Sequence, residues 1–236
     1  MTATPVQGLS LAPGDELLDH PDADPAVVRD SLRHISTANR WFGGWWAVRH
    51  GLRHLLAGIP PGTRLTLLDI GTGAGDLPLR AVAWAARRGI TLVPFGVERH
   101  PAAARLAQQQ GVPTLLGCAG ALPVRAGGVD IVIASQLVHH LAPAAIIDCC
   151  QTANAIARHG VIIADLRRSP VALAGFWLGS RLFGFDAATK ADGLTSVRRG
   201  FTATELTGLL RRAGIVTRVE QRPGFRLVAA WRTAAA

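Results

Sequence analysis

A glycine-rich stretch bracketed by two acidic residues carries the clearest chemical signal in this chain. Three glycines at alternating positions, Gly71, Gly73 and Gly75, lie between Asp69 and Asp76 and follow a short apolar run. Glycine lets a backbone turn tightly and approach a ligand that a Cβ atom would exclude. The dinucleotide fingerprint needs glycine where Asp76 stands, and the G-K-[ST] ending of a phosphate-binding loop is missing. Two flanking carboxylates suit a cationic ligand better than a pyrophosphate.

A third acidic residue, Glu98, ends the next apolar run. A carboxylate in this position can accept hydrogen bonds from both hydroxyls of a ribose. A ligand that combines a ribose with a positive centre and lacks phosphate is S-adenosylmethionine, so these acidic residues and glycines predict that cofactor.

Two adjacent histidines, His139 and His140, follow a fourth apolar run, and Asp165 ends a fifth. Histidine can remove a proton near neutral pH, as methylation of a hydroxyl or an activated ring carbon requires. One histidine is therefore a candidate base, which Asp165 could orient. The alternatives are that one histidine packs structurally while the other closes a helix, and that Asp165 is a cap.

Short apolar runs alternate with helical patterns along most of the chain, which predicts a parallel sheet with helices on both faces. The expected strands are 65–70, 91–97, 112–116, 129–135, 161–166, 215–221 and 225–231. Only three residues separate the last two, so they must form an antiparallel hairpin. The predicted fold is a Rossmann-like seven-stranded sheet of the α/β class, mostly parallel, with a C-terminal antiparallel hairpin and an N-terminal helical extension. The expected helices are one that starts at Pro25 and is interrupted at Gly43 and Gly44, and those over 45–56, 77–88, 101–110, 143–158 and 202–212.

The stretch LLDIGTGAGDLP resembles the first motif of class I S-adenosylmethionine-dependent methyltransferases. Glu98 matches their second-strand acid, residues 117–141 resemble a further motif that ends in H-H-L, and VIIADLRR is similar to their fifth-strand region. The nearest group in pattern is the small-molecule enzymes related to ubiquinone and menaquinone biosynthesis. The resemblance covers roughly residues 60–231 and is specific for the cofactor rather than for the methyl acceptor.

The resemblance implies a cofactor-binding role for a set of residues around the strand ends. The glycines would pass under the cofactor, with Asp69 and Asp76 near its amino-acid end and Glu98 at its ribose. The family's adenine-contacting Asp falls on Cys118, a poor acceptor for an amino group, so the adenine would rest near Ala119 and Arg99. The expected cofactor set is Asp69, Gly71, Thr72, Gly73, Gly75, Asp76, Glu98, Arg99, Cys118, Ala119, Ser135 and Gln136.

Two aromatic segments are candidates for the acceptor pocket. Trp41, Phe42 and Trp45 lie beside a glycine pair in residues 1–59, which we expect to form a helical lid before the main domain, 60–236. Phe176 and Trp177 lie in an irregular insertion, 167–200, whose length favours acceptor recognition. The alternative for the first segment is a hydrophobic staple that fixes the helices to the sheet.

Composition narrows the remaining possibilities. The chain has 236 residues and a net charge of +9, and twelve of its 25 basic residues fall in 167–236 with four acidic ones. This excess could attract RNA, although we favour an arginine-rich solvated surface, since the region has one lysine, no tight basic run and few interleaved aromatic residues. Three cysteines (Cys118, Cys149 and Cys150) can form no disulfide framework, so we expect a cytoplasmic protein, with the adjacent pair packed in the core. We expect no secretory signal, no transmembrane segment and no metal, although contact with a membrane interface is possible for a lipid-soluble acceptor.

These patterns together favour S-adenosylmethionine-dependent methyl transfer to a small apolar acceptor, such as a phenol, a quinol or a polyketide-like aromatic of secondary metabolism. O-methylation is slightly favoured over C-methylation. The alternatives are an RNA or protein methyltransferase that uses the basic C-terminal third, and a non-catalytic S-adenosylmethionine-binding regulatory module. The chain would act as a monomer or a homodimer, with no stable nucleic-acid partner.

Overall fold

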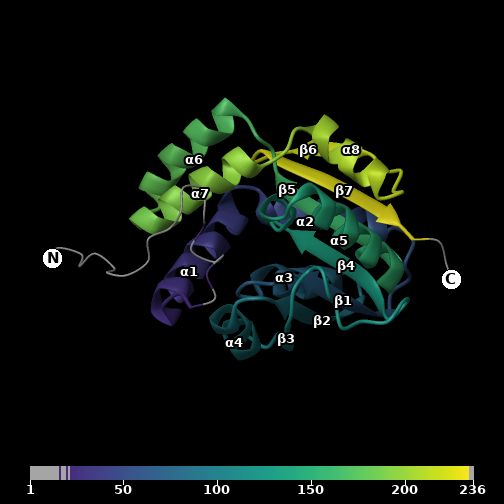
Figure 1. Cartoon of the computed structure of the whole chain (residues 1–236). Helices are drawn as coiled ribbons and strands as arrows, with labels where there is room; N and C mark the ends of the chain where they lie inside the picture. The colour runs from purple at the N-terminus through teal and green to yellow at the C-terminus, as the bar shows by residue number, and fades with distance from the viewer. Residues whose placement is uncertain (1–15, 17–19, 21, 234–236) are drawn as a thin grey trace.

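The computed structural model describes Glu16, His20 and residues 22–233, and these form a three-layer α/β structure around one sheet (Figure 1). The seven strands lie in the order β3-β2-β1-β4-β5-β7-β6. Their bounds are β1 Arg64–Ile70, β2 Thr91–Glu98, β3 Thr114–Leu116, β4 Val129–Ser135, β5 Ala157–Leu166, β6 Val219–Arg222 and β7 Arg226–Arg232.

The sheet confirms the predicted fold class. Strands β1 to β5 pair in parallel, whereas β7 runs antiparallel to both β5 and β6. Because β2 and β4 lie on opposite sides of β1, the chain reverses direction across the sheet at β1, and ligands bind at such a switch point.

Helices cover both faces of the sheet. Helices α2 (Gly44–Leu55) and α3 (Asp76–Ala86) pack on one face, while α5 (Pro143–Ile156) and α8 (Ala203–Arg212) pack on the other (Figure 1). Successive side chains of a strand point to opposite faces and so fill a core on each face of the sheet. Leu67 packs in the core under α2 and α3, and its neighbour Leu68 packs in the core under α5 and α8. Both leucines are fully buried.

Helix α1 (Pro25–Trp41) contacts α2, α4 (Pro101–Gln109) and α7 (Ala187–Arg199). Asp24 caps it by accepting a hydrogen bond from the Ala26 N–H at 2.8 Å, and Pro25 stands at the first helical position. We expected residues 1–59 to form a helical lid. Helix α2 instead packs on the sheet, so within the described part of 1–59 only helix α1 is in the position of a lid. The division of the chain at residue 59 stays a prediction.

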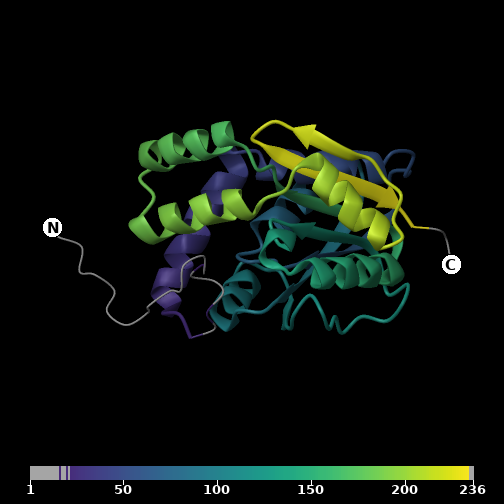
Figure 2. The same ribbon diagram turned by 45° about the horizontal axis from the view of Figure 1, so that its top comes forward.

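The insertion 167–200 is not irregular, which corrects the expectation from the sequence. It forms two helices, α6 (Pro170–Leu182) and α7 (Ala187–Arg199), that pack side by side (Figure 2). Ser169 caps α6 through the Val171 N–H, and Asp186 caps α7 through the Thr189 N–H. Helix α6 is apolar nearly all round, so it lacks the helical periodicity that makes an amphipathic helix visible in a sequence.

Other boundaries also differ from the expectation. Helix α5 ends at Ile156 and β5 begins at Ala157 without a loop, so the helix is shorter and the strand longer than predicted. Strand β6 begins at Val219 rather than at residue 215. None of the helices in the described part of the chain combines the length and hydropathy needed to cross a bilayer.

Candidate active site

A cavity of about 450 Å³ opens at the carboxyl ends of β1, β2 and β4. Helices α1, α6 and α7 wall it from the other side, and a volume of this order is typical of small-molecule sites. The predicted residues that line it are Phe42, Asp69, Gly71, Thr72, Gly73, Asp76, Glu98, Arg99, Cys118, Ala119, Ser135, Gln136, His139, His140 and Phe176.

The glycine loop after β1 adopts a conformation that requires glycine. Gly71, Gly73 and Gly75 have φ values of 72°, 55° and 80°, in the left-handed region. Glu98 fixes the loop, because its carboxylate accepts the Gly73 N–H at 2.9 Å and the His100 N–H at 2.9 Å. Gly75 does not line the cavity; a Cβ there would lie 2.9 Å from Val112, so this glycine permits close packing.

Three carboxylates, those of Asp69, Asp76 and Glu98, line one side of the cavity. Burial, against the hydrogen bond from Thr72 and with the help of the charges of Asp76 and Glu98, raises the pKa of Asp69 to about 8. Burial also raises the pKa of Asp76, although Asn39 and Arg80 oppose this. A cation bound here would be stabilised by all three groups.

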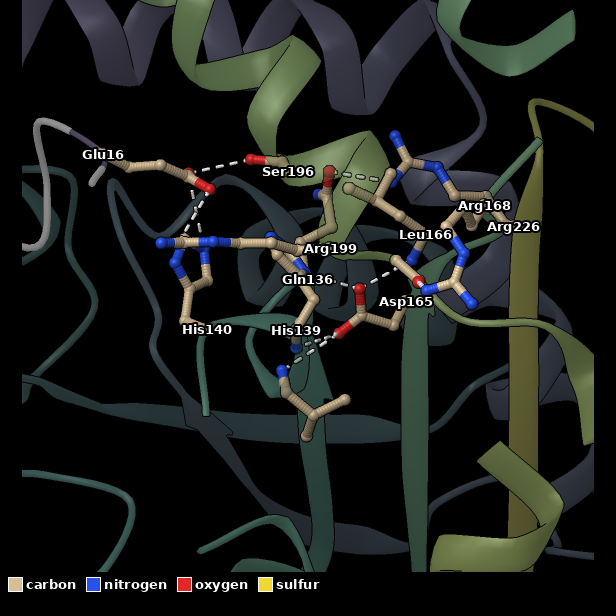
Figure 3. A network of polar contacts seen from close by, with 12 residues as sticks. Glu16, Gln136, His139, His140, Asp165, Leu166, Arg168, Ser196, Arg199 and Arg226 are labelled. Atoms are coloured by element: carbon tan, nitrogen blue, oxygen red, sulfur yellow. Dashed lines mark hydrogen bonds and ion pairs between the residues drawn. The ribbon is translucent and has the colours of Figure 1, made fainter. Parts of the chain in front are cut away.

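A chain of polar contacts spans the cavity from α1 to β7. Asn39 donates to both oxygens of Asp76, at 3.2 and 3.3 Å, and accepts from the side-chain amide of Gln136. Gln136 accepts in turn from Arg226 at 2.8 Å (Figure 3). Gln136 has φ 53°, unusual for a residue with a side chain, and such backbone outliers cluster at functional sites.

His139, which lines the cavity, forms a buried pair with Asp165, which lies outside the lining (Figure 3). The Nδ1–H of His139 donates to Asp165 Oδ1 at 2.6 Å, which leaves the Nε2 lone pair for a proton. Nε2 is buried and has no partner among the described residues. Burial raises the pKa of Asp165, but the charge and hydrogen bond of His139 outweigh it, and the net shift is downward. The N–H groups of Val138, His139 and Leu166 also orient the Asp165 carboxylate.

Glu16 and His140 form a second polar cluster beside this pair. The Glu16 carboxylate lies 3.7 Å from His140 Nε2, accepts from Ser196 at 2.8 Å and pairs with Arg199 at 3.2 Å (Figure 3). Glu16, His139 and His140 converge closely enough to ligate a metal ion. The guanidinium of Arg199 already neutralises the carboxylate, so the cluster suits a hydroxyl group better than a cation.

The aromatic candidates separate into an inner and an outer group. Phe42 and Phe176 line the cavity with their ring centroids 6.0 Å apart. Trp41 and Trp177 lie outside that lining and are 54% and 49% exposed, because adjacent helical residues point about 100° apart. Trp45, on α2, is partly buried and packs against the core on that face of the sheet, as a staple would.

The cysteine expectation holds for the adjacent pair. Cys149 and Cys150 are buried in the core under α5, and burial raises their pKa values to about 11 and about 12. Such thiols are inert toward redox chemistry. Cys118 is an exposed free thiol that lines the cavity.

Sequence reasoning missed four lining residues that hold the site together: Glu16, Asn39, Ser196 and Arg226. Their partners are up to 183 residues away in the chain, as for Glu16 and Arg199, so no local pattern reveals them. One usable signal existed at Arg226, a lone charge at the start of the apolar run FRLVAAW. It is buried, and burial lowers its pKa to about 10 even though Asp165 opposes the shift.

Comparison with known proteins gives matches in structure but not in sequence. No protein-family model matches the chain, and no curated protein matches it. A methyltransferase from Aquifex aeolicus that depends on S-adenosylmethionine (SAM) aligns with a TM-score of 0.60 at 15% identity, over 89% of this chain and 99% of that one. Human N-acetylserotonin methyltransferase, solved in complex with SAM, gives 0.61 at 15% identity over 94% of this chain and 60% of its own.

The pyocyanin biosynthetic protein PhzM gives a TM-score of 0.58 at 17% identity, over 94% of this chain and 62% of its own. At these identities the likeness concerns the fold. The strand order, the antiparallel β7 and the cavity at the switch point are in agreement with it. The chain therefore has the fold of class I S-adenosylmethionine-dependent methyltransferases.

Proposed function

We propose that this chain transfers a methyl group from S-adenosylmethionine to a small apolar acceptor that carries a phenol or quinol hydroxyl, with O-methylation favoured over C-methylation. The observation that carries the proposal is the two-ended cavity. One part of its lining consists of Asp69, Asp76 and Glu98 with the glycine loop, and another part holds His139 and three phenylalanine rings. These two parts suit a cation with a ribose and an apolar molecule with one ionisable hydroxyl.

The carboxylate side fits the cofactor on two grounds. Its three acidic groups would stabilise the sulfonium and ammonium charges. The only atom within 4 Å of a Cβ added to Gly73 would belong to Leu32, at 3.3 Å. Because glycine has no Cβ, it leaves this space open at the cavity wall. Bound S-adenosylmethionine would supply a methyl group activated by a positive sulfur. Asp69 and Asp76 would hold its amino-acid end, and Glu98 its ribose.

The chain's own chemical contribution would be to remove the acceptor's proton. With Nδ1–H held by Asp165, His139 can take a proton on Nε2 and the imidazolium would then be stabilised by the buried carboxylate. The second polar cluster, Glu16 with His140 and Ser196, would fix the hydroxyl of the acceptor near that nitrogen. Alignment and exclusion of water supply the rest of the rate.

The apolar part of the acceptor would lie among Phe42, Phe176 and Phe185. Phe185 is buried, with its ring centroid 6.3 Å from that of Phe42 and 6.3 Å from that of Phe176. A wall of aromatic rings favours a flat or lipidic molecule.

The basic C-terminal third gives less support to a nucleic-acid acceptor. Several of its arginines are engaged within the protein: Arg168 with Glu205, Arg222 with Glu220, Arg199 with Glu16, and Arg226 in the core. A surface that binds phosphates needs such side chains exposed and grouped on one face. The three free thiols support a cytoplasmic location, in line with a reducing compartment.

Calorimetric titration of the purified chain with S-adenosylmethionine, with NAD as the control ligand, tests the cofactor. We expect micromolar binding of S-adenosylmethionine and none of NAD. An assay with labelled cofactor and water-soluble phenols then tests transfer, and mass spectrometry of the product distinguishes O- from C-methylation. Binding without turnover on any phenol or quinol would favour the regulatory module, and binding of NAD would refute the proposal.

Proton release is expected when the cofactor binds. With its pKa raised to about 8, Asp69 is mostly protonated at pH 7, and a bound cation favours its ionised form. Binding at pH 7 should therefore release about half a proton or more, measured by calorimetry in buffers of different ionisation enthalpy. Asp69→Asn should abolish the release. Asp130→Asn, a carboxylate held by Thr66 and Arg158 away from the cavity lining, should leave it unchanged. Proton uptake by the wild type would contradict this assignment.

A further inference from the structure

The outward face of helix α6 is apolar where a surface helix normally carries polar side chains. Val171, Leu178 and Leu182 lie on one face of the helix and are 64%, 53% and 77% exposed. The opposite face packs inward, and a Cβ on Gly179 would come within 2.5 Å of the Phe42 ring. A helix that is apolar all round is ordinarily buried on all sides, so the outer face of α6 lacks a cover.

Aromatic residues from two segments extend this face. Trp41, at the end of α1, has its ring centroid 6.2 Å from that of Phe183, which follows α6 and is 42% exposed. Trp177 lies on α6 itself. Figures 1 and 2 both show α6 at the outer edge of the molecule, with α7 on its inner side. We call Trp41, Val171, Trp177, Leu178, Leu182 and Phe183 the α6 face.

Positive side chains lie against both tryptophans of the α6 face. Residues 170–183 include no Asp or Glu. The Arg181 guanidinium lies 3.6 Å from the centroid of Trp177, and that of Arg40 lies 5.1 Å from the centroid of Trp41. Tryptophan prefers the boundary between lipid headgroups and acyl chains, and arginine beside it meets the phosphates of that boundary. An apolar stripe with tryptophan–arginine pairs therefore complements an anionic lipid surface.

A continuous set of aromatic rings connects the α6 face to the cavity. Phe183 packs edge-on against Phe42, with centroids 5.5 Å apart, and Phe42 packs edge-on against Phe176. Phe42 and Phe176 line the cavity that also contains His139. An apolar molecule that leaves a membrane at the α6 face would meet aromatic carbon along this path.

We propose that the α6 face docks on an anionic phospholipid membrane and that the methyl acceptor is a lipid-soluble phenol or quinol taken from that membrane. The proposed docking depends only on the residues of the α6 face. The identity of the acceptor rests, in addition, on the proposed methyl transfer. Helix α6 would lie flat in the interface, since its 13 residues span about 20 Å.

Flotation of the full chain with phospholipid vesicles tests the docking without cofactor or acceptor. Wild type should bind vesicles of phosphatidylcholine and phosphatidylglycerol mixed roughly 2:1, and bind pure phosphatidylcholine at least about fivefold more weakly. Leu182→Glu should weaken binding about tenfold or more. Val216→Glu is the matched control, because Val216 is 92% exposed in the segment between α8 and β6, and this variant should bind within about twofold of wild type.

Three outcomes would overturn the docking. The first is no binding to either kind of vesicle. The second is binding that Leu182→Glu leaves unchanged, which would mean adsorption through other arginines. The third is a wild-type dimer that Leu182→Glu converts to a monomer without any vesicle binding, which would assign the α6 face to a second copy of the chain.

Enzyme assays separate this proposal from the proposed function. Leu182→Glu should keep its rate on a water-soluble short-chain phenol within about twofold, and lose about tenfold on a long-chain phenol presented in the same vesicles. Loss with the soluble phenol as well would refute the delivery role. A wild type inactive on both phenols that still floats with vesicles would fail the proposed function and leave the docking standing.

Discussion

Replacing His139 with Gln should lower the rate of methyl transfer by about 10²- to 10⁴-fold and leave the affinity for S-adenosylmethionine within about twofold. The glutamine amide cannot take a proton on a nitrogen in place of Nε2, although it fills similar space. The rate is best measured in a single turnover, because slow product release would otherwise hide the loss.

Asp165→Asn should give a loss of similar size through its effect on His139. The carboxylate that accepts Nδ1–H becomes an amide, which can instead donate to Nδ1 and leave the proton on Nε2. Asp165 also accepts three backbone N–H groups, so the thermal unfolding of this variant must be compared with that of wild type.

His50→Gln is the matched control for both variants. His50 pairs with Glu220 at 3.1 Å, which is also a histidine–carboxylate contact, but neither residue lines the cavity. It should change the rate by less than about twofold. A His139→Gln enzyme that keeps half its single-turnover rate would contradict the assignment. A larger loss in His140→Gln would transfer the role of base to the Glu16–His140 cluster.

The sequence was most informative where function depends on a few neighbouring residues. The loop from Asp69 to Asp76 and the strand end at Glu98 can be recognised in the sequence, because the residues of each lie close together in the chain. The loop glycines have positive φ values, which few other residues adopt. In the structure the Gly73 N–H donates to the Glu98 carboxylate, so two separate signals meet in one contact. The parallel strands of the sheet were equally easy to predict, since strands buried on both faces are continuous apolar runs.

What the sequence concealed depends on contacts between distant segments. The link from Asp76 through Asn39 and Gln136 to Arg226 joins α1, the end of β4 and β7, and a polar side chain in a helix or a strand gives no hint of its partner. The aromatic candidates show the same limit. Trp41 and Phe42 are neighbours in sequence, yet only the fold decides that one faces solvent and the other the cavity.

Helix α6 was missed for a different reason. Its glycines and its uniform hydropathy look irregular when the expected pattern is an amphipathic helix. The sequence does contain the signals for the start of this helix, with Ser169 at the N-cap and Pro170 at the first helical position. A segment with helix caps but without a polar face is one that needs covering on both sides, which is the property on which the docking proposal rests.

Gly73→Ala should weaken the binding of S-adenosylmethionine by about tenfold or more, a cost of about 1.4 kcal/mol. Gly73 has φ 55°, where a side chain costs about 1–2 kcal/mol, and the added Cβ would stand at the cavity wall, 3.3 Å from Leu32. The carboxylate of Glu98 holds the Gly73 N–H in place, so the loop cannot turn to move the methyl group aside without losing that contact. Calorimetric titration at constant pH measures the loss.

Gly62→Ala separates the cost of the backbone conformation from the cost at the cavity. Gly62 has φ 87° and no atom within 4 Å of an added Cβ, and it lies outside the cavity lining. Both variants should lose stability by a similar amount in thermal unfolding, because each forces alanine into the left-handed region. Only Gly73→Ala should lose affinity. If the two variants bind S-adenosylmethionine equally well, the cofactor does not lie against Gly73, and the loop would be a tight turn whose glycines serve packing alone, as Gly75 does against Val112.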